Sequence, residues 1–134
     1  RCSAVTRGML LQLNDLIRDN FEVDGPRWNQ KFYVAYRVGH YNWLFVDTQP
    51  SRLRLDFLVK AGTFSQEALA TDLGVEQFDT EDSLAEKLSL PSSVQVRSRN
   101  ESIDRVRLRI KEGFDLESEA FLAFLKRAYK AFPK

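Results

Sequence analysis

The chain has 134 residues, with 20 basic and 19 acidic side chains and a net charge of +1. Its 43% of hydrophobic residues is typical of a globular domain rather than of a disordered chain, and the length suffices to bury a core. Total charge therefore gives no general attraction to nucleic acid or membranes, and any such attraction depends on where the charges lie. We expect one domain over residues 1–134.

Cysteine and histidine each occur once, as Cys2 and His40, which excludes an internal disulfide and a Cys/His zinc site. The single cysteine favours a reducing, cytoplasmic setting. No apolar run is long enough to span a bilayer, so we expect no membrane partner. The chain begins with Arg1-Cys2-Ser3 and has no initiator Met. From this start we expect a domain excised from, or appended to, a longer polypeptide.

The first half predicts one helix followed by a meander of strands. Apolar residues recur every three or four positions over residues 6–21, and Asp24-Gly25-Pro26 then has turn chemistry. Alternating apolar residues predict strands over residues 31–38, 43–48 and 52–60. The middle strand is apolar on both faces, which favours a central position.

The second half predicts two helices, two strands and a last helix. The β pattern stops after residue 62, and we expect helices over residues 63–73 and about 80–88. Two alternating segments, 94–96 and 106–110, follow as a hairpin, and residues 121–132 carry a broad apolar helix face.

The expected fold class is α+β, with the order α-β-β-β-α-α-β-β-α. About five antiparallel strands form a sheet with the helices packed on one face. The order has no strand–helix–strand regularity, and the sequence has no glycine-rich phosphate loop. A doubly wound nucleotide-binding fold is therefore not expected.

Cations alternate with aliphatic residues through residues 105–111, which places four cations on one face of a strand. Other strands show the same alternating pattern. Together they predict a basic sheet face made of Arg52, Arg54, Arg97, Arg99, Arg105, Arg107, Arg109 and Lys111. Such a face can bind the phosphates of DNA or RNA, because the planar guanidinium matches a phosphate. It can also be a solvated surface, neutralised by nearby acids such as Asp56, Glu101, Asp104 and Glu112.

Seven aromatic residues fall within residues 28–45. Three of them, Tyr33, Tyr36 and Trp43, are candidates for an aromatic ligand groove. A thick aromatic core also explains them, because aromatic residues in strands need no ligand.

No catalytic centre is expected. A catalytic triad would need His40 as its base, but this histidine lies in an expected turn, and Cys2 lies near the chain end. The acidic residues suit a charged helix surface rather than a metal cluster. We therefore predict a protein that is not an enzyme and that needs no metal or cofactor.

Several segments resemble a family of small uncharacterised bacterial domains labelled predicted transport proteins, which are often attached to restriction or defence-related polypeptides. The matching segments are residues 31–36, 45–50, 52–57, the closing strand and 121–129. The insert at about 73–91 departs from the family. The resemblance implies an accessory module, and the transport label is not expected to hold because no segment fits a membrane.

The leading hypothesis is a non-catalytic accessory module that binds nucleic-acid phosphates through the Arg-rich sheet face. Two alternatives remain open. One is a protein-interaction or regulatory domain whose terminal helices dock a neighbouring domain or an acidic or apolar partner. The other is a small-ligand sensor that uses the aromatic groove.

Overall fold

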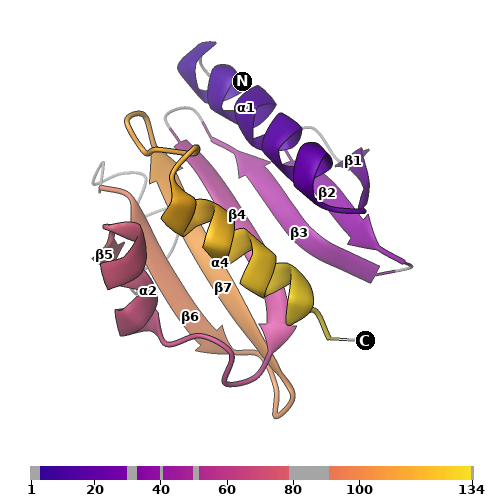
Figure 1. The fold of residues 1–134 in the computed structure, drawn as a ribbon, viewed down its shortest axis with the longest axis vertical. Helices are drawn as coiled ribbons and strands as arrows, with labels where there is room; N and C mark the ends of the chain where they lie inside the picture. Colours follow the sequence, from indigo (N-terminus) through magenta and orange to yellow (C-terminus); the bar gives the residue numbers. More distant parts are fainter. Residues whose placement is uncertain (1–3, 30–32, 40, 50–51, 79–90, 134) are drawn as a thin grey trace.

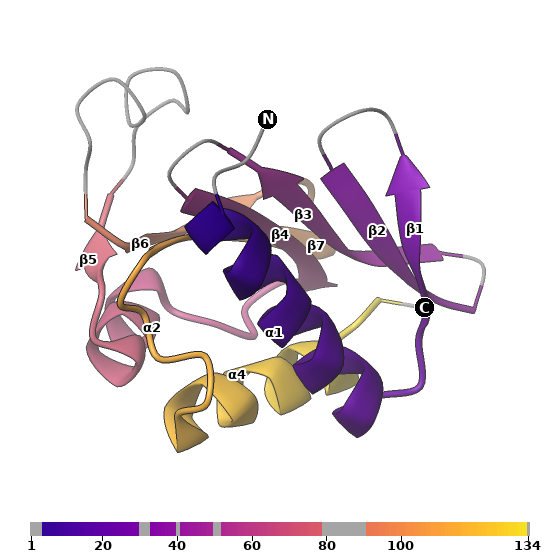
Figure 2. The same ribbon diagram turned by 90° about the horizontal axis from the view of Figure 1, so that it is seen from above.

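A computed structural model describes residues 4–29, 33–39, 41–49, 52–78 and 91–133. Seven strands form one sheet, and the three helices of these residues cover one of its faces (Figures 1 and 2). The helices are α1 (Ala4–Asn20), α2 (Gln66–Leu73) and α4 (Glu119–Lys130). The strands are β1 (Asp24–Asn29), β2 (Tyr33–Val38), β3 (Tyr41–Thr48), β4 (Arg52–Lys60), β5 (Glu76–Gln77), β6 (Ser93–Ser98) and β7 (Ile103–Lys111).

The strand order across the sheet is β1-β2-β3-β4-β7-β6-β5. Every neighbouring pair is antiparallel except β5 and β6, which run parallel. In Figure 1, α1 lies over β2 and β3, while α4 crosses β4 and β7 and α2 lies near β6. The sheet face opposite the helices, which we call the open face, carries no helix of the described residues (Figure 2).

The core forms between the helices and the central strands β4 and β7. These two strands pair over nine positions without a bulge, from Arg52 opposite Lys111 to Lys60 opposite Ile103. Their helix-side residues are apolar and fully buried: Leu53, Leu55, Phe57, Val59, Val106, Leu108 and Ile110. Because side chains alternate between faces along a strand, the same register sends the polar residues of both strands to the open face.

An aromatic cluster joins α1, α4 and the sheet. The Trp43 ring lies 5.5 Å from that of Phe21, 5.6 Å from Phe57 and 5.3 Å from Tyr129, between centroids. Trp43 Nε1 donates a hydrogen bond to Ala128 O at 3.2 Å. The Tyr129 hydroxyl donates to Glu22 O at 2.8 Å, so the cluster ties both helices to β3 and β4.

The antiparallel α+β class is confirmed, but the expected number of strands is wrong. The sheet has seven strands rather than about five, because β1 and β5 were not expected. β1 contains the Gly25-Pro26 pair that looked like a turn, and it is an edge strand, where a residue without an N–H is tolerated. β5 has only two residues, too few to show alternation.

The helix expected to end at Leu73 does so, and Gly74 caps it in the left-handed conformation, with φ of 66°. The expected helix at about 80–88 lies outside the described residues. Among the described helices, none combines the length and apolar character needed to cross a membrane.

Replacing Trp43 by Phe should lower the free energy of unfolding by about 2 kcal/mol, because the smaller ring leaves a gap and the bond to Ala128 O is lost. Urea unfolding followed by circular dichroism measures the change. Tyr41→Phe in the same strand is the matched control, since Tyr41 is 66% exposed. Equal shifts in the two variants would contradict the role given to the aromatic cluster.

Candidate functional site

The open face gathers most of the basic residues singled out in the sequence. Antiparallel pairing of β6, β7 and β4 aligns their outward positions in rows across the sheet. These rows hold Arg52, Arg54, Arg97, Arg105, Arg107, Arg109 and Lys111. Arg99 lies in the turn between β6 and β7, next to the outer end of the face.

Three pairs of cations lie directly opposite each other on neighbouring strands: Arg97 with Arg105, Arg54 with Arg109, and Arg52 with Lys111. Like charges at directly opposed positions destabilise a sheet, since their Cβ atoms are only about 5 Å apart. The face therefore requires acceptors or anions that offset this repulsion.

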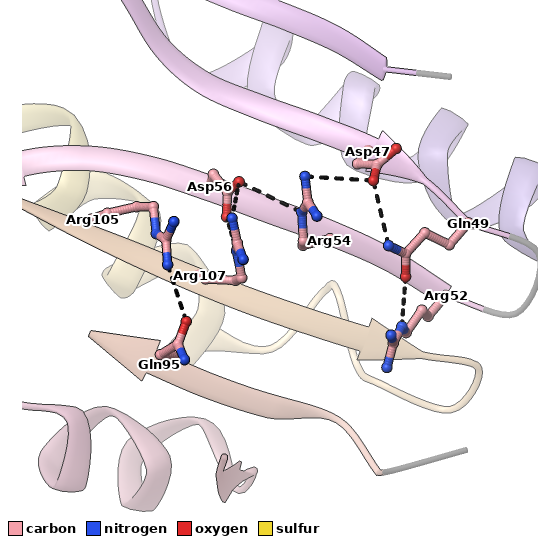
Figure 3. Close-up of polar contacts among 8 residues, drawn as sticks. All are labelled: Asp47, Gln49, Arg52, Arg54, Asp56, Gln95, Arg105 and Arg107. Atoms are coloured by element: carbon pink, nitrogen blue, oxygen red, sulfur yellow. Dashed lines mark hydrogen bonds and ion pairs between the residues drawn. The ribbon is translucent and has the colours of Figure 1, made fainter. Parts of the chain in front are cut away.

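Asp56 contacts two arginines at the centre of the face (Figure 3). It lies opposite Arg107 in the register and accepts two hydrogen bonds from that guanidinium, from Nε at 2.7 Å and from Nη2 at 3.1 Å. Its Oδ2 also lies 3.5 Å from Arg54 Nε. The two-bond arrangement is the strongest geometry for an arginine and a carboxylate.

The chain of contacts continues from Arg54 across β3 (Figure 3). Asp47 Oδ2 lies 3.5 Å from Arg54 Nη2 and accepts a bond from Gln49 Nε2 at 3.4 Å. Gln49 Oε1 in turn accepts a bond of 2.6 Å from Arg52 Nε. Burial lowers the pKa of Arg54, with the carboxylates of Asp56 and Asp47 opposing that effect. These residues therefore form one connected polar network.

Two of the expected phosphate-binding residues are buried. Arg52 is 2% exposed and Arg109 is 1% exposed, so neither presents its guanidinium on the surface of the structure. Arg107 and Arg54 have side chains that are 15% and 21% exposed and are held in the network. The exposed cations of the expected set are Arg97 and Arg99, with Arg105 and Lys111 half-buried.

Arg105 stands outside the network. Its Nη2 donates a hydrogen bond to Gln95 Oε1 at 3.2 Å, and within the described part of the chain it forms no ion pair (Figure 3). Its Nε is buried and has no hydrogen-bond partner. Burial lowers its pKa, and the neighbouring Arg107 lowers it further. An anion placed here would therefore relieve both the lost hydration and the repulsion.

Two hollows meet beside Arg105. The cationic hollow has a volume of 240 Å³ and is lined by Arg97, Ser98, Arg99 and Arg105. The mixed hollow has a volume of 270 Å³ and is lined by Phe45, Asp47, Arg54, Asp56, Leu58, Arg99 and Arg105. Because Arg99 and Arg105 line both hollows, the two are neighbours on the same end of the open face.

Two of the three residues expected to line an aromatic groove lie in the core. Tyr36 and Trp43 are both fully buried on the helix side of the sheet. The Tyr36 hydroxyl donates to Asn14 Oδ1 at 2.7 Å, and burial raises its pKa. The side chain of Tyr33 lies outside the described residues. Tyr36 also lines a hollow of 180 Å³ together with Leu10, Leu11, Asn14, Pro26 and Val34, so a ligand groove at these rings stays a prediction.

The two single residues considered for catalysis, His40 and Cys2, also lie outside the described residues. In the described ranges, no group of three or more histidine, cysteine or acidic side chains is arranged to hold a metal ion.

Sequence reasoning missed four residues that shape this end of the face: Phe45, Asp47, Leu58 and Gln95. For three of them, the sequence does contain a signal. Strict alternation along β3 and β4 puts Phe45, Asp47 and Leu58 on the face opposite Leu44, Val46 and Phe57. The apolar character of residues 43–48 on both faces hid this, because it suggested two equally buried sides.

Comparison with protein-family models, with curated protein sequences and with solved structures finds no match to this chain. The function proposed below therefore rests on the geometry of the open face.

Replacing Asp56 by Asn should lower the free energy of unfolding by about 2 kcal/mol, because Arg107 and Arg54 lose the carboxylate that offsets their charges. Chemical denaturation at low salt measures the loss. Glu101→Gln is the control, because Glu101 is an exposed acid in the nearby turn. If both variants unfold at the same denaturant concentration, Asp56 does not hold the face together.

Proposed function

We propose that this domain is a non-catalytic accessory module that binds nucleic-acid phosphates at the outer end of its open face. The binding residues in this proposal are Arg97, Arg99 and Arg105. The observation that carries it is the state of Arg105, a half-buried guanidinium opposite Arg97, with a buried Nε that lacks a hydrogen-bond partner.

The division of the open face into two parts supports the proposal. At the centre, Asp56 and Asp47 offset the charges of Arg54 and Arg107, which is what a structural role requires. At the end near the β6–β7 turn, Arg97 and Arg99 are exposed and line a hollow with Arg105. Arginine offers a planar fork of donors to a phosphate, and several arginines around one hollow suit a phosphate better than a lone surface charge does.

An accessory role in a restriction or defence-related protein belongs to the same proposal. It follows from the sequence resemblance and suits a site that binds without catalytic groups. In such an arrangement this domain would supply affinity for the nucleic acid, while a neighbouring domain would supply the chemistry.

The salt dependence of binding tests the proposal. Three phosphate contacts should give a slope of log K against log salt of about −2.7 for duplex DNA and about −2.1 for a single strand. Fluorescence anisotropy with labelled oligonucleotides measures it. In Arg97→Gln and in Arg105→Gln the slope should be less negative by about 0.9 on a duplex or 0.7 on a single strand.

The matched control is Lys126→Gln, which removes an exposed cation from α4 on the helix side of the sheet. It should leave the affinity and the slope close to those of the unaltered protein. Binding that does not depend on salt, or that is as strong in Arg97→Gln and Arg105→Gln as in the control, would rule out the proposed interface. Circular dichroism confirms that each variant is folded.

A further inference from the structure

Gln95 is an uncharged side chain that lies among arginines on the open face, where it is 2% exposed. Each residue of β6 on this face lies opposite an arginine of β7: Ser93 opposite Arg109, Gln95 opposite Arg107, and Arg97 opposite Arg105. The sequence of β6 contains no acidic residue. This strand therefore offers the arginines of β7 two neutral side chains and one more cation.

Arg105 and Arg107 are two residues apart on the same face of β7, yet their guanidinium groups have different partners. Arg107 donates two hydrogen bonds to the carboxylate of Asp56, of 2.7 and 3.1 Å. Arg105 Nη2 donates one of 3.2 Å to the amide oxygen of Gln95. A carboxylate offsets the charge of an arginine, whereas an amide oxygen carries only a partial charge. Gln95 therefore fixes the direction of Arg105 without cancelling its charge.

The groups around Arg105 leave it short of negative charge. Burial lowers the pKa of Arg105, and the repulsion of Arg107 lowers it more than the attraction of Asp56 raises it. Arg97 and Arg54 lower it further. An anion that accepts a hydrogen bond from Arg105 would therefore enter a region where positive charge is in excess.

A glutamate would fit the place of Gln95, because the two side chains have the same length and shape. Its carboxylate would accept the same hydrogen bond from Arg105 and would lie opposite Arg107. Hydrogen bonds between charged groups are roughly twice as strong as neutral ones. A glutamate would thus supply from within the chain the negative charge that a phosphate supplies from outside.

We propose that Gln95 is a positioning residue of the phosphate interface: its amide oxygen holds Arg105 at the cationic hollow, and its neutrality leaves the charge of Arg105 to the phosphate. This inference rests on the proposed function and deepens it by naming the residue that sets the charge of the site. Arg105 lines both hollows, whereas Gln95 is not among the described residues that line either of them. Gln95 therefore acts through Arg105 and does not itself contact the ligand.

Gln95→Glu tests the neutrality of this position. The variant keeps the size of the side chain and places a carboxylate against Arg105, so the phosphate contact of Arg105 should be lost. We expect labelled duplex DNA to bind about tenfold more weakly at low salt, which corresponds to one hydrogen bond to a charged group. The slope of log K against log salt should become less negative by about 0.9. Fluorescence anisotropy measures both quantities, and circular dichroism confirms the fold.

Gln95→Met tests the positioning separately. Methionine has a similar length but no acceptor oxygen, so Arg105 keeps its charge and loses the group that directs it. Duplex DNA should bind about threefold more weakly, with the salt slope unchanged. In the Arg105→Gln background, the same substitution should change the affinity by less than about twofold, because the residue through which Gln95 acts is absent. A role in folding alone would weaken binding equally in both backgrounds.

Gln12→Glu is the matched control. Gln12 is exposed on α1, on the helix side of the sheet, so this variant makes the same change of charge away from the open face. It should leave the affinity within about twofold of that of the unaltered protein, since solvent and salt screen a distant exposed charge. Its salt slope should also stay the same.

A Gln95→Glu variant that binds as the control does would overturn this inference, and a loss of slope in Arg105→Gln would then leave the phosphate interface standing. Equal losses from Gln95→Met in the two backgrounds would also overturn it, and this comparison decides the question if Gln95→Glu does not fold. Unaltered binding in both Arg97→Gln and Arg105→Gln would remove the proposed function, and this inference with it.

Discussion

The pairing of β4 with β7 is the constraint on which the rest of the structure depends. Nine consecutive positions pair without a bulge, so the apolar residues of both strands meet under the helices. Side chains alternate with a period of two, and the same register therefore forces the intervening arginines together on the open face. The apolar core and the charged open face are thus two consequences of one strand register, and a change of that register would move both.

The carboxylate that offsets the arginines lies where their charges are most shielded from water. At the centre of the face, the Asp56 side chain is 14% exposed and takes part in contacts with both Arg107 and Arg54. Repulsion is strongest where water is excluded, so a carboxylate at this point stabilises the sheet most. Towards the β6–β7 turn, Arg97 and Arg99 are exposed, and water screens their repulsion. The exposed arginines of the face therefore lie at that end.

The sequence predicts those features that depend on alternation alone, and it fails where contacts between distant segments decide the outcome. The basic row of residues 105–111 and its face follow directly from the period of two. The burial of Arg52 and Arg109 does not, because it depends on neighbours brought together by the fold. Trp43 shows a second reason why the sequence pattern fails to predict the structure. Tyr36 pairs with Leu44 and Arg37 with Asn42, so Trp43 is an extra residue in a bulge, and it packs in the core although strict alternation would place it beside Phe45.

Arg97 and Arg105 form a pair of like charges at the outer end of the open face. The two residues face each other in the register, and Arg105 has Gln95 rather than a carboxylate as its partner within the described residues. A neutral amide fixes the direction of a guanidinium without cancelling its charge, so Arg105 is held in place and remains attractive to an anion. An anion that binds the folded state here would stabilise it by mass action, since the unfolded chain does not hold the two arginines together. Binding of an anion at this end of the sheet would therefore be coupled to stability, whereas at the centre Asp56 already supplies a negative charge to Arg54 and Arg107.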